Sequence, residues 1–446
     1  MLIRRIAFIA LALGSIALLA RSTARSISPA DTKLIYTATP RYEAMAWLHG
    51  EDRFPQGAHI VTANGSRVLV PDFFATADAA VSFDATHILF AGKRAQTDRW
   101  QIWEIAAAGS DPRRITTCAD DCVQPFYLPD DRVVYARRID GRFVIEVSSP
   151  DGAAQPLTFI PGTAFPTDVL RDGRILFEAG DPLGSDTASE FYTVYSDGSG
   201  VESYRCDHGK SRHSGKQLSS GDIVFATARG LGRFTSALAR EAEVKTTSSG
   251  YAGDVAEDSN GDWLISSRLD SNAHYTLHRW NPGTNSLRAL AAMAGTDIVQ
   301  PQLLTPRPTP NRHPSGLHDW DGANLLCLNA YTSKLKIADG SIASIRLYTR
   351  SPKGEPVLLG SSPVESDGSF FLHVPSEQPL QIELLDRSGA PLQREHGWFW
   401  MRRGEQRECV GCHAGPERAP ENAVPAVLLR STDPVDMTSQ APQGVH

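Results

Sequence analysis

Two cysteines and a histidine late in the chain have the spacing needed to attach a cofactor covalently. Cys409 and Cys412 are separated by two residues, and His413 follows directly. In such a CxxCH motif each thiol adds to one vinyl group of a porphyrin, and the histidine supplies an axial nitrogen to the iron. We therefore predict one covalent haem c, with Cys409 and Cys412 as thioether sites and His413 as an axial iron ligand.

A structural zinc half-site and a redox-active CxxC pair are the alternative interpretations of this motif. Zinc needs two further soft ligands, and downstream of the motif only His446 could serve. A thioredoxin-like CxxC lies where a strand passes into a helix. The flanking residues, Arg407-Glu408 and Ala414-Gly415-Pro416, do not suggest that context.

The residues just before the motif are candidates for the remainder of the cofactor site. Met401 and His396 are the nearest candidates for a second axial ligand, with simple packing and an exposed turn as the alternatives. Trp398 and Trp400 could wall the porphyrin face and lower the local dielectric. Arg407 could pair with a haem propionate, because a guanidinium matches a carboxylate, or it could lie in a solvated turn.

A second group of soft donors lies earlier in the chain. Cys206, His208 and His213 fall within a few residues of one another, just before a predicted strand. Thiolate and imidazole are the ligands that transition metals prefer, so these three residues are candidate metal ligands. Isolated histidines of this kind are more often surface or hydrogen-bonded residues.

The remaining cysteines suggest disulfides. Cys118 and Cys122 are separated by three residues, which predicts a small local disulfide in an oxidising compartment. Cys206 and Cys327 are then left, and they could pair with each other. The metal-ligand role for Cys206 is the open alternative.

The first residues predict export. Arg4 and Arg5 precede an apolar run, Ile6 to Ala20, that has the length of a signal-peptide core and is short for a membrane-spanning helix. Small residues at 22–24 offer a cleavage site. We expect a signal peptide over 1–24 and a periplasmic or otherwise exported protein, with an uncleaved N-terminal anchor as the alternative.

The composition favours a β-rich protein with more than one domain. The chain has 446 residues, including 36 glycines and 29 prolines, and a net charge of −7. Its acidic and basic residues are interspersed, which predicts no nucleic-acid partner and no basic membrane-binding patch. Apart from the apolar run near the start, no segment predicts an integral membrane protein.

A repeated template organises residues 30–304. Each copy has a polar lead, an Asp/Gly turn and an apolar strand, with a period of about 40 to 48 residues, which is the size of one propeller blade. The copies lie at 82–90, 128–135, 170–177, 218–225 and 258–265. Residues 33–37 and 299–304 complete one further blade from both ends, which closes the ring. The fold class is therefore all-β, beginning with a six-bladed β-propeller.

Four further segments follow the propeller. We predict a proline-rich linker at 305–321, a small antiparallel β-sandwich at 322–395, a haem c-binding segment at 396–432 and a disordered tail at 433–446. The predicted sandwich strands are Ser344–Tyr348, Asp367–Val374 and Leu380–Leu385.

The chain resembles two known families. The repeats are similar to those of TolB-type propellers, with the best match at 80–116. The run Gly-Glu-x-Arg-x-Cys-x-Gly-Cys-His at 404–413 and the Asp-Gly-Ser-Phe-Phe strand at 367–371 resemble the family related to the hydrazine synthase alpha subunit. That resemblance implies a propeller followed by a domain with haem c, in a periplasm-like compartment.

One departure from that family limits what the resemblance implies about function. The hydrazine-forming enzyme carries several haems, whereas this sequence has a single CxxCH, so joining of nitrogen compounds is not expected to transfer. We favour a mono-haem redox protein whose propeller docks a redox partner protein. The alternatives are a haem enzyme acting on a small nitrogenous or oxygen species, and a non-catalytic propeller scaffold.

Overall fold

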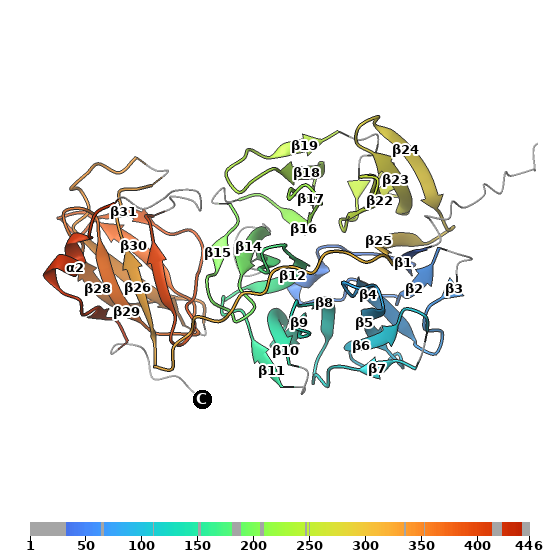
Figure 1. The fold of residues 1–446 in the computed structure, drawn as a ribbon, viewed down its shortest axis with the longest axis horizontal. Helices are drawn as coiled ribbons and strands as arrows, with labels where there is room; N and C mark the ends of the chain where they lie inside the picture. The colour runs from blue at the N-terminus through green and yellow to red at the C-terminus, as the bar shows by residue number, and fades with distance from the viewer. Residues whose placement is uncertain are drawn as a thin grey trace, which may run out of the picture.

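A computed structural model shows two β-rich domains side by side (Figure 1). It describes residues 33–63, 67–109, 111–149, 153–180, 189–205, 209–245, 248, 250–333, 336–351, 353–412 and 422–438. The first domain is a ring of sheets, and the second contains two further sheets packed together.

Six sheets form the first domain, and we number them as blades 1 to 6 in the order of their innermost strands. Blade 1 contains β4 (Ala75–Val81), β5 (His87–Lys93), β6 (Gln101–Ala106) and β7 (Arg113–Arg114). Blade 2 contains β8 (Cys122–Tyr127), β9 (Val133–Ile139), β10 (Arg142–Ser148) and β11 (Ala154–Pro156). Blade 3 contains β12 (Thr163–Val169), β13 (Ile175–Gly180), β14 (Glu190–Val194) and β15 (Glu202–Ser203).

The remaining blades continue the ring. Blade 4 contains β16 (Arg212–Gln217), β17 (Ile223–Thr227), β18 (Gly230–Phe234) and β19 (Ala242–Val244). Blade 5 contains β20 (Gly250–Tyr251), β21 (Ala256–Glu257), β22 (Trp263–Arg268), β23 (Thr276–Asn281) and β24 (Ser286–Ala291). Blade 6 contains β25 (Asp297–Leu303), β1 (Leu34–Thr39), β2 (His59–Thr62) and β3 (Arg67–Val68).

Blade 6 closes the ring with strands from both ends of the domain. β25 pairs antiparallel with β1, with Val299 opposite Thr37, and β25 also contacts β4 of blade 1. This pairing removes the exposed strand edges that an open ring would leave. The predicted six-bladed propeller, including its closing blade, is confirmed.

The Asp/Gly turns of the repeat template have a common backbone geometry. In the five template copies one turn residue has a φ between 59° and 95°, namely Ala85, Asp131, Gly173, Gly221 and Gly261. Glycine and aspartate tolerate this left-handed conformation better than most residues. The template therefore marks the tight turn between the first two strands of each blade.

A second backbone feature recurs where the innermost strands face the propeller axis. Five non-glycine residues there have φ between 50° and 57°. Four lie at a register irregularity of their strand, namely Asp78, Gln124, Ser214 and Gln300, and Asp254 lies between β20 and β21. All five are buried. The side-chain amide of Gln300 donates to Asp78 (2.6 Å), and the amide N–H of Gln124 donates to the other oxygen of Asp78 (3.0 Å). These polar residues connect neighbouring blades at the centre of the ring.

The long loop between β1 and β2 inserts into this polar centre. It carries the short 3-10 helix η2 (Ala46–His49), and Trp47 of η2 stacks on Phe165. The buried guanidinium of Arg53 pairs with Asp78 and donates to Gln124 (2.6 Å). The loop therefore supplies a cation to a carboxylate that would otherwise be buried unpaired, which is a costly state.

Glu178 on β13 is a second buried carboxyl group near the axis. One of its oxygens accepts a hydrogen bond from the backbone N–H of Ser214 (2.8 Å). Burial raises the pKa of Glu178 to about 8, although Arg53 and Lys216 act in the opposite direction. This side chain is therefore mostly protonated at neutral pH.

The linker predicted at 305–321 contains no helix or strand in the described residues and runs across the propeller towards the second domain (Figure 1). It is held by backbone hydrogen bonds to the turns of two blades. Arg307 N–H donates to the carbonyl oxygen of Phe83 (2.8 Å), and Asn311 N–H donates to that of Arg171 (2.8 Å). The linker is therefore attached to the propeller rather than suspended between the domains.

The second domain is a β-sandwich. Its first sheet has the order β32-β26-β29-β33 and its second the order β28-β27-β30-β31. The elements are β26 (Ala323–Cys327), β27 (Ser344–Arg350), β28 (Pro356–Pro363), β29 (Phe370–Val374), β30 (Gln381–Leu385), β31 (Pro391–Arg394), β32 (Gln406–Cys409), α2 (Ala426–Arg430) and β33 (Val435–Asp436). The three predicted strands correspond to β27, β29 and β30.

Two features of this domain differ from the predictions. The sandwich is not purely antiparallel, because β32 runs parallel to β26 and β33 runs parallel to β29. Both added strands come from the segments at 396–432 and 433–446, which were expected to lie outside the sandwich. Met437, in the segment predicted to be a disordered tail, is buried in the sandwich core. These segments complete the first sheet.

Replacing Glu178 with glutamine should change how stability depends on pH. The folded protein keeps the Glu178 proton up to about pH 8, whereas the unfolded chain loses it near its ordinary pKa, 4.5. This group therefore stabilises the fold most below the unfolded pKa, and the contribution is lost as pH rises towards 8, on the order of a few kcal/mol. Urea unfolding between pH 5 and 8 should show a smaller decline in Glu178→Gln than in wild type.

The exposed Glu243 on β19 offers the matched control for this measurement. Glu243→Gln should leave the wild-type decline unchanged. Parallel pH profiles for wild type and Glu178→Gln would contradict the raised pKa.

Candidate functional site

The predicted attachment cysteines lie at and just beyond the end of an edge strand of the sandwich. β32 ends at Cys409, which is opposite Cys327 of β26 in the register. The N–H of Leu328 donates to the carbonyl oxygen of Cys409 (2.9 Å), which fixes the strand end. Both Cys409 and Cys412 are partly exposed. His413 lies outside the described residues.

Close packing explains why residue 411, between the two cysteines, is a glycine. A Cβ atom at Gly411 would lie 2.2 Å from the carbonyl oxygen of Thr332. A larger residue would therefore push the turn that carries Cys412 away from the neighbouring loop. The glycine of the motif thus suits the packing of this turn, and the two-residue spacing suits the positions of the two thiols.

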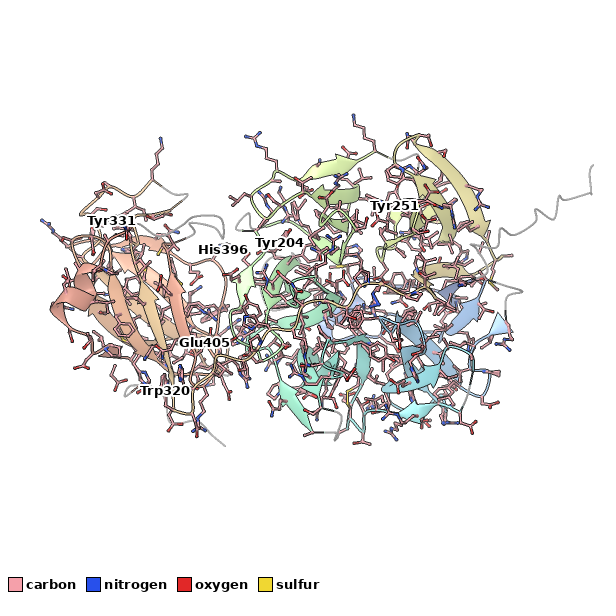
Figure 2. All side chains as sticks on the ribbon, viewed as in Figure 1. Tyr204, Tyr251, Trp320, Tyr331, His396 and Glu405 are labelled. Atoms are coloured by element: carbon pink, nitrogen blue, oxygen red, sulfur yellow. A yellow bond between two sulfur atoms is a disulfide. The ribbon has the colours of Figure 1, made fainter. Side chains whose placement is uncertain are left out.

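A cavity of about 670 Å³ opens beside the two cysteines. It lies between the domains, where Figure 2 labels Tyr204, His396 and Glu405. The propeller contributes Tyr192 and Tyr204, and the sandwich contributes Trp398, Cys409 and Cys412. A cavity of this size at a domain boundary, with aromatic walls, is typical of a cofactor or ligand site.

A buried carboxylate joins the two domains below this cavity. Glu405 accepts hydrogen bonds from the guanidinium of Arg407 (2.7 and 2.9 Å) on one oxygen, and the N–H of Gly200 in the propeller donates to the same oxygen (3.1 Å). The other oxygen accepts from the N–H of Arg402 (2.7 Å). The Arg407 guanidinium lines the cavity but is already paired, so it would have to share its donors with a propionate.

The two tryptophans predicted to wall the porphyrin, Trp398 and Trp400, differ in whether they line the cavity. Trp398 lines the cavity. Trp400 does not line it but is fully buried against Phe177 and Phe159 of the propeller, and its indole N–H donates to the carbonyl oxygen of Gly198 (2.9 Å). Trp400 therefore fastens the sandwich to the propeller.

Neither predicted second axial ligand lines the cavity. Met401 is fully buried in the sandwich core, which agrees with the packing alternative. His396 is exposed, and its neighbours Glu395 and Gly397 line the cavity. The chain here lies close to the propeller, since a Cβ atom on Gly397 would be 3.2 Å from the Tyr192 hydroxyl.

Most of the second predicted metal cluster falls outside the described residues. Cys206 and His208 lie outside them. His213 is buried on β16, and its ring contacts the hydroxyl of Ser214 (3.3 Å) at the propeller centre. Burial lowers the pKa of His213 to about 4, so the imidazole is neutral there. No group of three or more His, Cys, Asp or Glu side chains within the described residues has the arrangement of a metal site.

The cysteines outside the motif give one confirmation and one correction. Cys118 and Cys122 form a disulfide, as predicted. Cys327 is free and buried, so the considered pairing with Cys206 is not formed. Its thiol instead forms a hydrogen bond with Cys412, and this bond and burial raise the pKa of Cys327. Sequence reasoning did not place this thiol beside the motif, because the two meet only through the pairing of β26 with β32.

The protonation of the motif itself follows from its surroundings. Desolvation raises the pKa of the Cys409 thiol to about 11, against a smaller opposing effect of Arg407. The thiol is therefore protonated at neutral pH when no cofactor is attached.

Among the described residues, no helix is long and apolar enough to cross a membrane.

Comparison with known proteins supports the resemblance stated from the motif. Residues 338–414 match the family described as hydrazine synthase alpha subunit middle domain. This stretch covers most of the sandwich and the motif, and over these residues the predicted resemblance to the hydrazine synthase alpha subunit family is confirmed.

One solved structure shows the same fold over more of the chain. Hydrazine synthase from Kuenenia stuttgartiensis is similar with a TM-score of 0.75 and 16% identity, covering 89% of this chain and 71% of that chain. TolB from Acinetobacter baumannii has a TM-score of 0.45 and 14% identity, covering 62% of this chain and 68% of that chain. No protein with curated annotation matches the chain.

Replacing Trp400 with alanine should loosen the sandwich from the propeller. The change removes a fully buried indole and its hydrogen bond to Gly198. Large-to-small changes of this kind cost about 3–5 kcal/mol of unfolding free energy, which circular dichroism during urea unfolding measures.

Trp320 in the linker is the matched control, because it is 39% exposed and stacks on His318. Trp320→Ala should cost less than about 1 kcal/mol. Equal losses in the two variants would show that Trp400 does not carry the domain junction.

Proposed function

We propose that the protein is an exported mono-haem c-type redox protein, with the haem attached through Cys409 and Cys412 and held axially by His413. The observation that carries the proposal is that both thiols open onto the aromatic-lined cavity between the domains. When bound, the haem supplies one-electron redox chemistry. The chain's own residues supply the walls and the charged groups of the site.

The cavity residues fit a porphyrin chemically. Trp398, Phe399 and Tyr192 supply flat apolar surface, which excludes water and lowers the dielectric around the iron. Arg205 and Arg407 also line the cavity and provide guanidinium donors for carboxylates. The cavity therefore combines apolar walls with cationic groups, as a ring bearing two propionates requires.

The propeller is proposed as the docking platform for a redox partner protein. The haem cavity lies at the outer side of blade 3, where β14 and the chain around β15 contribute to its wall. A partner that approaches this boundary would contact both domains. The net charge of −7 favours a partner with basic surface at low ionic strength.

Export is part of the proposal. The basic and apolar residues at 4–20 have the signal-peptide pattern. The disulfide between Cys118 and Cys122 supports an oxidising compartment, because disulfides rarely persist in the cytosol. Covalent haem attachment of this type also belongs to such a compartment.

One alternative has specific support. A haem enzyme acting on a small nitrogenous or oxygen species is consistent with the fold shared with hydrazine synthase. The spin state of the iron separates this alternative from an electron carrier.

Covalent haem should be present in protein expressed with a c-type maturation system in the periplasm. Wild type should carry one haem per chain by pyridine haemochrome assay and intact mass, and the double variant Cys409→Ser/Cys412→Ser should carry none, because the thioether sites are removed. Low-spin spectra unchanged by carbon monoxide would support the electron carrier.

Cys327→Ser is the matched control, since it removes a neighbouring thiol outside the motif and should keep the haem. Wild-type protein without covalent haem absorbance would overturn the proposal.

A further inference from the structure

We propose that His313 of the linker is the second axial ligand of the haem attached at Cys409 and Cys412. The inference rests on the proposed function, because it needs that haem. His313 lines the same cavity as the two cysteines. An imidazole nitrogen at the second axial position makes the iron six-coordinate, which suits electron transfer rather than binding of an external molecule.

The described lining residues leave few other strong ligands. His313 is the one histidine among them, and none of them is a methionine. Met401 is enclosed in the sandwich core and His396 lies beside the cavity without lining it. The two candidates nearest to the motif in sequence are therefore less well placed than a residue of the linker.

The propeller holds the His313 ring in a defined orientation. The ring stacks on Tyr195 with centroids 3.7 Å apart and planes inclined by 24°. Tyr195 itself lies in a tight turn, where its N–H donates to the carbonyl oxygen of Ser199 (3.0 Å) and its own carbonyl oxygen accepts from the N–H of Gly198 (2.9 Å). The imidazole is thus supported by a rigid part of blade 3.

A carboxylate in the same turn is suited to act on this histidine. The Oδ1 atom of Asp197 accepts from the N–H and the hydroxyl of Ser199 (3.0 and 2.6 Å). The carboxylate also interacts with the side chain of Ser315 and, to a smaller extent, electrostatically with His313, and both effects lower the pKa of Asp197. Metal-bound histidines commonly donate their other N–H to such a carboxylate, which sets the tautomer.

The linker is fixed on both sides of His313. Before it, the N–H of Asn311 donates to the carbonyl oxygen of Arg171 in the propeller (2.8 Å). After it, the N–H of His318 donates to the carbonyl oxygen of Gly404, shortly before the motif (3.0 Å). His313 is therefore presented to the cavity by two fixed points, one on each domain.

The test compares His313→Ala with His318→Ala in the haem-loaded protein. His318 is the matched control, because it belongs to the same linker but stacks on Trp320 and does not line the cavity. Electron paramagnetic resonance of the ferric protein should show low-spin iron in wild type and His318→Ala, and high-spin iron in His313→Ala. Apparent cyanide affinity should rise at least about tenfold in His313→Ala, since no internal ligand competes.

The outcomes separate this inference from the proposed function. Wild type without covalent haem would defeat the proposed function, and this inference with it. Covalent haem with high-spin wild-type iron, or low-spin iron that persists in His313→Ala, would overturn the role of His313 alone. Added imidazole should restore the low-spin signal in His313→Ala, which shows that the variant is folded and that an empty coordination position causes the change.

Asp197→Asn tests the positioning role of the carboxylate. Removing the negative charge makes the axial imidazole a weaker electron donor, so the reduction potential should rise while the iron stays low-spin. Asp172→Asn, at another turn of blade 3, is the control and should leave the potential unchanged. An unchanged potential in Asp197→Asn would remove Asp197 from the proposal.

Discussion

The buried carboxylate of Glu405 is the constraint on which the candidate site depends. It binds Arg407 of the adjoining strand β32, the backbone of Arg402 and the backbone of Gly200 in the propeller. Because a buried charge is stable only when it is paired and hydrogen-bonded, the start of β32 has to stay against the propeller turn. The strand then carries Cys409 to the boundary between the domains, where the cavity lies.

The site is therefore composite, and neither domain contains it alone. The sandwich provides the two thiols and Trp398, while the propeller provides tyrosines and the linker provides His313. Trp400 next to this region is buried among propeller aromatics. Packing between the domains thus sets the shape of the cavity, so any movement of the sandwich would change the surroundings of a bound cofactor.

The sequence predicted most of the fold because the propeller repeats its own local signals. Four of the five template copies carry a turn residue suited to left-handed backbone, such as Asp131 or Gly173, followed by a buried strand. The motif likewise singled out Cys409 and Cys412, which line the cavity between the domains. Partners distant in sequence could not be predicted: Cys327 meets the motif only through pairing of β26 with β32.

His313 is a second residue whose position could not be predicted from the sequence. Its proline-rich surroundings predicted an extended linker, but proline content carries no information about which face of the propeller that linker crosses. The position follows from hydrogen bonds such as that of Asn311 to Arg171, whose donors and acceptors are backbone groups present in every residue. Backbone hydrogen bonds do not depend on the type of side chain. A ligand residue in an extended segment can therefore be recognised only when the position of that segment is known. The composition of the linker suggests only a spacer between two domains. Its backbone hydrogen bonds make it an element that connects both domains at the site.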